Sequence, residues 1–419
     1  MILITRLGKT KYFIPAELMN ILFLISCHKK NGTPGSHLRG NIKDPSLFPF
    51  KYEFHFRQTC VLKLFIFMKE CSMKHIITVA ALFFIATAIM AQSNDATVNQ
   101  TGAEQTATVT QTGNDNLTTV DQVAEASSYG PGKQTSEVKQ TGSTNTANVD
   151  QQQLGGGGKT ENTAYIEQVG NSNMGTQSET APNSNSGQHQ WAKQVGDDNT
   201  STQTTNAGYT NSFNADIAGN DNTTTQTMAA NHSHGNIDII GNSNLATQTL
   251  TGSNHGYNYG INITQLGDNN EATQSFSGSG LGHVQRGDVW QEGSLNYATQ
   301  LSNGPDNIAN TYQLGDLNDA FSNLDGSNNA ADIDQIGDAN FADSYQTGDD
   351  NTATISSTGN NNGNLADPVI ITQNGTTNLA TIMQNGDFNA ANVSQTGDSH
   401  EAAVNQTGNT NASTVTQSD

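Results

Sequence analysis

Apolar and amide side chains alternate with polar ones in short runs that recur every eleven residues near the C-terminal end. A glutamine ends each run, a β-branched residue lies two positions before it, and in all but the last run a glycine follows two positions after it. Alternation with a period of two predicts a strand with one buried face, and glycine followed by Asp and Asn predicts a turn. The five glutamines are Gln373, Gln384, Gln395, Gln406 and Gln417.

The same unit can be followed from residue 100 to residue 417 as the pattern Gln-x-Gly-x-x-Asn-x-Ala-x-Val-x-Gln. We expect its inward amides to stack into ladders, as in cross-β assemblies, and its glycines to take positive φ angles in turns. The predicted ladder residues are Gln100, Gln111, Gln140, Gln168, Gln194, Gln265, Gln291, Gln313, Gln335, Gln346, Gln373, Gln384, Gln395, Gln406, Gln417, Asn145, Asn340, Asn378, Asn389 and Asn411. The predicted turn glycines are Gly142, Gly315, Gly337, Gly375, Gly386, Gly397 and Gly408. Some positions that correspond to the marker glutamine hold an apolar residue instead, namely Ile217, Met228, Ile239, Leu250, Phe276 and Leu324.

The length of the units predicts how they are arranged in space. Six units between residues 122 and 291 are longer than eleven residues, and all six have odd numbers when counted from residue 100. This predicts a rung of two units with the extra residues on one side. The fold class is therefore all-β, a parallel β-solenoid of about 13 rungs of roughly 22 residues, about 60 Å long. A seventh long unit, 357–373, breaks the alternation and predicts a change of register or a domain seam.

Charge and cysteine content limit the classes of partner. Residues 92–419 contain no cysteine and five lysines and arginines against 34 aspartates and glutamates, a formal net charge of −29. Nucleic acid and anionic lipid repel such a chain, so we expect neither as a partner. The composition alone is typical of disorder, but the strict period favours an ordered repeat.

Residues 73–91 have the pattern of a secretory signal peptide. A short positive start at Lys74 precedes an apolar run, and the small residue Ala91 precedes the expected cleavage point. We therefore expect residues 92–419 to be the mature secreted repeat region, with no membrane span.

Residues 1–72 stand before this signal and need a separate interpretation. We expect them to be a spurious upstream extension, with true initiation at Met68 or Met73. The alternative is an atypical leader in which Cys27, after Leu24-Ile25-Ser26, is acylated as in a lipoprotein.

The repeat resembles the curlin repeat of bacterial curli subunits. The segments that carry the resemblance read QTGNTNASTVTQ at 406–417, QNGDFNAANVSQ at 384–395 and QTGSTNTANVDQ at 140–151. The resemblance implies a secreted structural subunit of functional amyloid fibres in the biofilm matrix, on the surface of a Gram-negative bacterium. It also implies self-association into fibres, export through an outer-membrane secretion pore and templating by a nucleator subunit. This chain has more repeats than the usual major subunit, which leaves an accessory, nucleating or adhesive role open.

Aromatic and basic residues concentrate in the long units of the repeat region. All five of its lysines and arginines lie there, and aromatic side chains beside Arg and Lys are typical of contact surfaces. We hypothesise that one edge of the solenoid bears an adhesive or glycan-binding strip, directed at a host or abiotic surface. The alternative is that insertions tolerate any residue. The candidate residues are Trp191, Tyr209, Tyr257, Tyr259, Arg286 and Trp290.

Metal and catalytic chemistry are weakly represented in the sequence. His232 and His234 would share a face of a strand but have no third ligand nearby, and an exposed loop is the simpler interpretation. Repeated Gly-Asp pairs could stack carboxylates for calcium, although turn formation alone explains them. No nucleophile elbow, Walker loop or dinucleotide fingerprint occurs. We expect no metal, no cofactor and no enzymatic activity.

Two other classes of protein compete with the fibre subunit. A monomeric cell-surface β-solenoid adhesin or glycan-binding protein should cap its open ends, whereas the last unit, 406–417, keeps the full motif. An ice-binding solenoid should present a regular outward array of threonine, and the outward positions here are mixed. The pattern therefore favours end-to-end growth.

Overall fold

The computed structural model describes residues 4–7, 10–13, 93–102, 104–124, 133–153, 161–181, 187–206, 210–255, 259–283, 285–364 and 367–419. The chain divides into two units, Met1–Phe83 and Phe84–Asp419. In the first unit, β1 (Ile4–Leu7) and β2 (Thr10–Phe13) form an antiparallel pair. The predicted signal peptide, Cys27, Tyr209 and Tyr257 lie outside the described residues.

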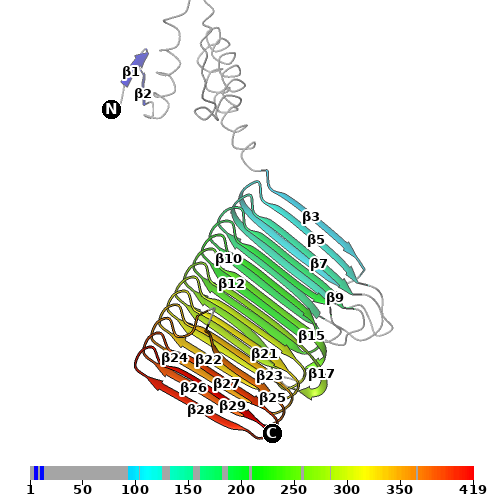
Figure 1. The fold of residues 1–419 in the computed structure, drawn as a ribbon. Helices are drawn as coiled ribbons and strands as arrows, with labels where there is room; N and C mark the ends of the chain where they lie inside the picture. The colour runs from blue at the N-terminus through cyan, green and yellow to red at the C-terminus, as the bar shows by residue number, and fades with distance from the viewer. Residues whose placement is uncertain are drawn as a thin grey trace, which may run out of the picture. The chain divides into compact units, whose positions relative to one another are not determined.

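The second unit is a parallel β-solenoid of two sheets, which we call the odd sheet and the even sheet (Figure 1). The odd sheet has 14 strands and the even sheet has 13. The odd strands are β3 (Asp95–Thr101), β5 (Leu117–Ala124), β7 (Thr146–Gln153), β9 (Met174–Ala181), β11 (Thr200–Asn206), β13 (Thr223–Ala229), β15 (Leu245–His255), β17 (Glu271–His283), β19 (Tyr297–Asn303), β21 (Asp319–Asp325), β23 (Phe341–Thr347), β25 (Val369–Asn374), β27 (Ala390–Thr396) and β29 (Ala412–Ser418). The even strands are β4 (Gln105–Asn114), β6 (Lys133–Ser143), β8 (Glu161–Val169), β10 (Gln188–Val195), β12 (Asn211–Ala218), β14 (Ser233–Ile240), β16 (Tyr259–Leu266), β18 (Arg286–Glu292), β20 (Ile308–Leu314), β22 (Ala330–Ile336), β24 (Thr352–Thr358), β26 (Leu379–Asn385) and β28 (Glu401–Thr407).

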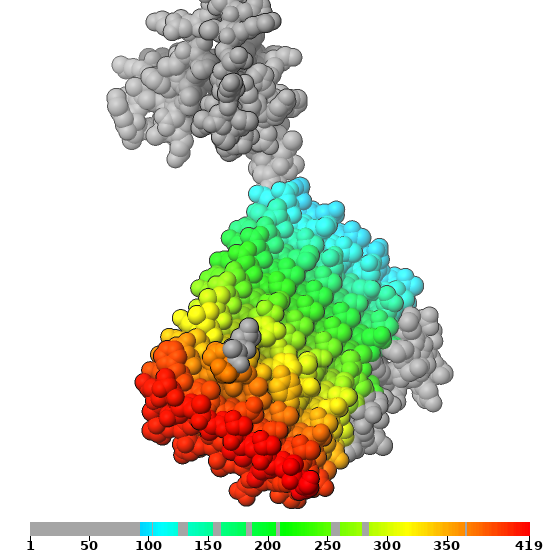
Figure 2. All heavy atoms as spheres, in the orientation of Figure 1, coloured from blue at the N-terminus to red at the C-terminus, as the bar shows by residue number. Residues whose placement is uncertain are grey.

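The predicted two-unit rung and parallel stacking are confirmed. Each strand from β5 to β27 pairs in parallel with the strands two before and two after it, so successive units alternate between the sheets. Equivalent positions of neighbouring rungs are register partners, as Gln111 and Gln140 are between β4 and β6. Figure 2 shows the result as bands of side chains that follow one another along the unit in chain order.

The long unit 357–373 does not break the solenoid, and the expectation of a register change or seam is wrong. β25 pairs in register with β23 on one side and β27 on the other. The extra residues lie between β24 and β25, so they leave the solenoid at the even-to-odd connection. The six earlier insertions lie at the odd-to-even connections instead. Both kinds of insertion are accommodated because a connection can lengthen without changing strand pairing.

The core is a thin layer between the inward faces of the two sheets. Val120, Ile166, Ile263 and Ile355 are among the inward side chains with no exposed surface, as strict alternation along each strand requires. Glycine makes room for the largest of these residues. A Cβ on Gly287 would lie 2.5 Å from Cζ of Phe276, which is itself fully buried.

The described residues form strands, turns and bends only. No described helix is long and apolar enough to cross a membrane. Within this part of the chain, β3 and β4 at one end and β28 and β29 at the other each have a strand partner on one side only.

Candidate functional site

Glutamine side chains form the first ladder, in the even sheet. From Gln111 each Nε2 donates to Oε1 of the next glutamine toward the C-terminus, at 2.9, 2.8 and 2.8 Å, as far as Gln194. Ile217 and Ile239 then interrupt the ladder, and it resumes from Gln265 to Gln335 at 2.9 Å per step. These amides are buried, and each bond joins two neighbouring rungs. The members of this ladder are Gln111, Gln140, Gln168, Gln194, Gln265, Gln291, Gln313, Gln335, Gln384 and Gln406.

The odd sheet carries the corresponding ladder only near its two ends. Gln100 begins the first part, which runs through Gln122 and Gln151 to Glu179 with distances of 2.7, 2.7 and 2.9 Å. The last part joins Gln346, Gln373, Gln395 and Gln417 at 2.8, 2.9 and 2.8 Å.

Between these two parts the glutamines occupy a different inward column, two residues earlier in each strand. Distances of 2.7, 2.8, 2.9, 3.0 and 2.9 Å join the successive amides. The sequence analysis missed this ladder, although a Thr-Gln pair in each of the six strands was a signal for it. Its members are Gln177, Gln203, Gln226, Gln248, Gln274 and Gln300.

Asparagines form two further ladders at the turns. In the first, Nδ2 of Asn145 donates to Oδ1 of Asn116 at 3.0 Å and to the carbonyl of Gly170 at 2.8 Å. Each asparagine side chain therefore donates to the asparagine on its N-terminal side, whereas each glutamine in the glutamine ladders donates to the one on its C-terminal side. This ladder contains Asn94, Asn116, Asn145, Asn173, Asn199, Asn222, Asn244, Asn270, Asn296, Asn318, Asn340, Asn362, Asn389 and Asn411. The second contains Asn307, Asn329, Asn351 and Asn378 and ends on the backbone N–H of His400.

The turn glycines have positive φ angles and stack closely on one another. The seven predicted ones have φ between 101° and 136°, a region that favours glycine. A Cβ on Gly142 would lie 1.8 Å from the carbonyl oxygen of Gly170 in the next rung, so the column admits no side chain. Gly408, in the last turn of its column, is different, because its nearest atom would be 3.8 Å away.

Each turn also holds a second residue with positive φ, which the sequence analysis missed. The residue before the turn asparagine is left-handed even when it is Thr144, Leu317 or Phe388, with φ of 58°, 61° and 57°. Such a conformation costs a non-glycine residue roughly 1–2 kcal/mol. Backbone bonds to the neighbouring rung hold it in place, as from Phe388 N–H to the carbonyl of Asn360 at 3.0 Å.

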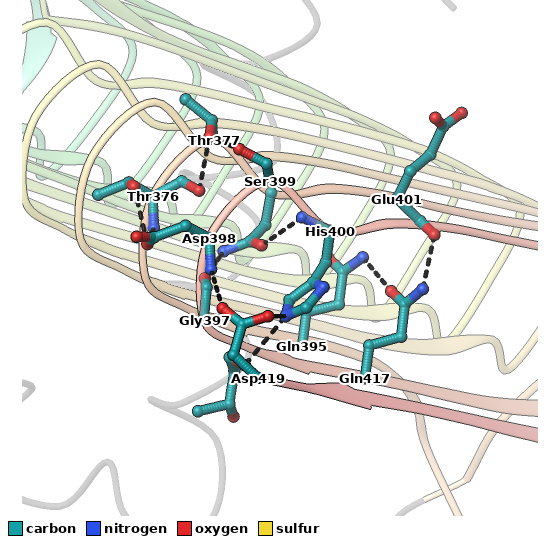
Figure 3. Close-up of polar contacts among 12 residues, drawn as sticks. Thr376, Thr377, Gln395, Gly397, Asp398, Ser399, His400, Glu401, Gln417 and Asp419 are labelled. Carbon is teal, nitrogen blue, oxygen red and sulfur yellow. Dashed lines mark hydrogen bonds and ion pairs between the residues drawn. The ribbon is translucent and has the colours of Figure 1, made fainter.

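The turn aspartates accept hydrogen bonds from the previous rung. Oδ1 of Asp338 accepts the N–H of Asp316 at 2.9 Å, and Oδ1 of Asp398 accepts the N–H of Thr376 at 2.9 Å. Asp419 continues this arrangement, since its Oδ2 lies 3.2 Å from the N–H of Asp398 and its Oδ1 lies 3.4 Å from Nε2 of His400 (Figure 3). Bonds from hydroxyl and backbone donors of Thr376 lower the pKa of Asp398. Turn formation therefore accounts for these carboxylates.

The described residues contain no group of three or more His, Cys, Asp and Glu side chains suited to a metal ion. His232 lies in a turn with φ of 57°, as the loop interpretation expects, whereas His234 lies in β14, so the two histidines do not share the face of a strand.

Glu179 is the one charged residue in the glutamine ladders, and the sequence analysis did not identify it. Its side chain is fully buried, Oε2 accepts the bond from Gln151, and Oε1 has no hydrogen-bond partner. Burial raises the pKa of this carboxyl well above its usual value, and the bond from Gln151 opposes the shift. The folded protein therefore favours the protonated acid, whereas the unfolded chain ionises above its ordinary pKa of 4.5.

We expect Glu179→Gln to stabilise the solenoid by about 1–3 kcal/mol at pH 7.5, because the amide extends the ladder without a proton. In the natural chain, the contribution of Glu179 to stability is fully present below its unfolded pKa of 4.5 and is lost as pH rises through the raised folded pKa. Urea unfolding between pH 4 and 8 measures this, and Glu292→Gln at an exposed position is the matched control. Burial and the negative charge of Asp319 raise the pKa of Asp343 to about 6. The stability of the Glu179→Gln variant should therefore keep a smaller dependence on pH of the same sign. An unchanged pH slope in Glu179→Gln would contradict the assignment.

The candidate adhesive residues whose side chains the structure describes, Trp191, Arg286 and Trp290, lie in two separate strands of the even sheet. Trp191 lies in β10 and Trp290 in β18, both facing outward from the even sheet, with exposed fractions of 43% and 41%. Arg286 also lies in β18 and bonds Oδ2 of Asp288 at 2.6 Å. Tyr259 begins β16. The two tryptophans are thus separated by three intervening strands.

Stacked parallel rungs, amide ladders and glycine columns define the chain as a β-solenoid repeat protein. The model of the curlin associated repeat matches it five times, at residues 91–123, 304–337, 326–359, 368–397 and 389–418. The chain therefore contains five curlin associated repeats. No curated protein matches it. The five matches lie outside residues 124–303, where insertions and the shifted glutamine column change the motif.

Proposed function

We propose that the chain is a structural subunit of a curli-like amyloid fibre outside the cell, and that it grows by end-to-end stacking of solenoids. The proposal includes export through the signal peptide at residues 73–91 and an outer-membrane pore, and templating by a nucleator. The curlin repeats support the class of protein, and the geometry of the solenoid ends supports the mode of growth.

The observation that carries the proposal is that the two ends of the solenoid expose the same groups that join neighbouring rungs inside it. Every internal interface consists of two parallel strand pairs with a column of turn glycines and an asparagine ladder, and most interfaces also contain glutamine ladder bonds. β3 and β4 present one half of such an interface and β28 and β29 the other half. Unpaired strand edges are templates for further strands.

The direction of the ladders supports head-to-tail growth. Within each glutamine ladder Nε2 donates toward the C-terminus, so Gln406 and Gln417 lie at the donor end and Gln100 and Gln111 at the acceptor end. A second copy that continues the ladders must therefore join by its N-terminal end.

Dilution of the full chain from denaturant tests polymerisation. We expect a disordered start, a rise in thioflavin fluorescence and β circular dichroism, and fibre reflections near 4.7 Å and about 10 Å. Prompt folding to a β-rich monomer without fibres would favour the monomeric adhesin instead.

Gly408→Ala tests the mode of growth separately. In a single copy the added Cβ lies 3.8 Å from its nearest neighbour, so the solenoid should fold. In a stacked copy it would meet the next rung, as a Cβ on Gly386 meets the carbonyl of Gly408 at 2.3 Å. We expect growth from wild-type seeds to slow by about tenfold or more. Unchanged elongation would rule out stacking through this end.

A further inference from the structure

An exposed aromatic pair interrupts the polar outer face of the even sheet. Tyr165 in β8 and Trp191 in β10 are register partners, and their rings stack with centroids 3.8 Å apart and planes 16° apart. The next strand places Asn214 opposite Trp191, so the stack ends at the tryptophan. Trp191 retains 43% of its surface exposed, a large apolar area on the outer face of the sheet.

A groove of about 510 Å³ lies over these strands and is lined by both rings. Its polar lining comes from hydroxyl, carboxylate, imidazole and amide groups of Thr135, Glu137, Thr163, His189 and Asn214. Nδ1 of His189 and Oγ1 of Thr163 are 2.6 Å apart, and Oγ1 of Thr135 is buried without a hydrogen-bond partner. An apolar platform with a few convergent polar groups is the usual composition of a small-ligand site.

We infer that this groove binds a pyranose unit of a neutral polysaccharide, with the sugar ring against Trp191. The C–H groups on one face of a pyranose pack on an indole, while its hydroxyls at the ring edge need donors and acceptors together. The groove supplies that mixture, since the Glu137 carboxylate accepts hydrogen bonds, while the Asn214 amide and the Thr163 hydroxyl can both donate and accept them.

Other occupants fit less well. An extended peptide would need free backbone groups, but β8, β10 and β12 each pair with a strand on both sides. An organic cation would meet Lys139, whose Nζ lies 5.2 Å from the Tyr165 ring centre and 2.6 Å from Oε1 of Glu137. A polyanion would be repelled by the formal charge of −29 on residues 92–419.

This site gives a ligand class, neutral polysaccharide, to the surface adhesion hypothesised from the sequence, and it does not depend on polymerisation. Trp191 and Tyr165 lie on the outer face, away from the ladders and from both solenoid ends. We therefore expect Trp191→Ala to form fibres at the wild-type rate. A failure to form fibres would contradict the proposed function, whereas a failure to bind sugar would contradict only the site at Trp191.

The first test uses Trp191 as its own reporter. The chain has two tryptophans, so Trp290→Phe in the full chain leaves Trp191 as the single one. Titration with cellohexaose and maltohexaose should give a saturable change in its emission with at least one of them. No saturable change with either oligosaccharide, or a response only to an anionic alginate oligosaccharide, would overturn the assignment.

Calorimetry on matched variants completes the test. We expect Trp191→Ala to lower the association constant for the responding hexasaccharide at least about tenfold, as for an aromatic anchor. Trp290→Ala, an equally exposed tryptophan on the same sheet, should retain the wild-type constant. Equal binding by the two variants would place the sugar elsewhere and overturn the proposal.

Discussion

Replacement of Gly386 by alanine is expected to cost about 3–5 kcal/mol of solenoid stability, the sum of left-handed strain and overpacking. Gly386 has φ of 128°, and its new Cβ would lie 2.3 Å from the carbonyl oxygen of Gly408. Neither group can move away easily, because the backbone on both sides is fixed by inter-rung hydrogen bonds such as Gly386 N–H to Thr358 O at 2.9 Å. The midpoint of urea unfolding of the freshly folded chain measures the loss.

Gly408→Ala is the matched control, since Gly408 lies in the same column one rung further on. Its φ is 101°, but its Cβ would meet nothing closer than 3.8 Å. The Gly408→Ala variant should therefore lose roughly 1 kcal/mol of stability through its backbone conformation alone, because its Cβ clashes with no neighbouring atom. Equal losses in the two variants would show that rung-to-rung contact does not exclude a side chain here.

Phe276→Ala is expected to destabilise the solenoid by about 3–5 kcal/mol through the cavity it leaves. Phe276 is fully buried in a cluster with Phe213, Leu250 and Ile261. The stacked strands cannot collapse into the space because their spacing is set by backbone hydrogen bonds. Equilibrium unfolding in urea measures the change, and Phe388→Ala, 59% exposed, should change it by no more than about 0.5 kcal/mol.

A double variant tests whether Gly287 is small because Phe276 is large. Gly287→Ala alone should destabilise, because its Cβ would lie 2.5 Å from Cζ of Phe276. In the Phe276→Ala background the same change fills vacated space and should be neutral or stabilising. Additive effects of the two substitutions would contradict this coupling.

The rung, the two sheets and the inward or outward direction of most side chains could be predicted from the sequence. A period of two separates the faces of a strand, and odd-numbered insertions revealed the two-unit rung. The particular inward column of a glutamine could not be obtained in this way. Gln203 and Gln151 face the same core from adjacent columns, so the alternation that places both inside does not distinguish them.

Contacts between rungs were the least predictable feature. Glu179 looks like one more acidic residue until the register places it beneath Gln151. Tyr165 and Trp191 are 26 residues apart with an insertion between them, and only strand pairing makes them neighbours. Insertions of unequal length hide such pairs, because separation in sequence no longer reports separation in rungs.

The alternation of successive units between two sheets has a consequence for how such a gene can change in length. Loss or duplication of a whole rung, 22 residues near the C-terminal end, leaves every later strand in its own sheet. Loss of a single eleven-residue unit would transfer all later strands to the opposite sheet. The insertions would then leave from the other connection, and the column of Gln177 and Gln203 would continue into apolar residues of the even strands such as Ile237. Recombination should therefore preserve this protein in steps of two units.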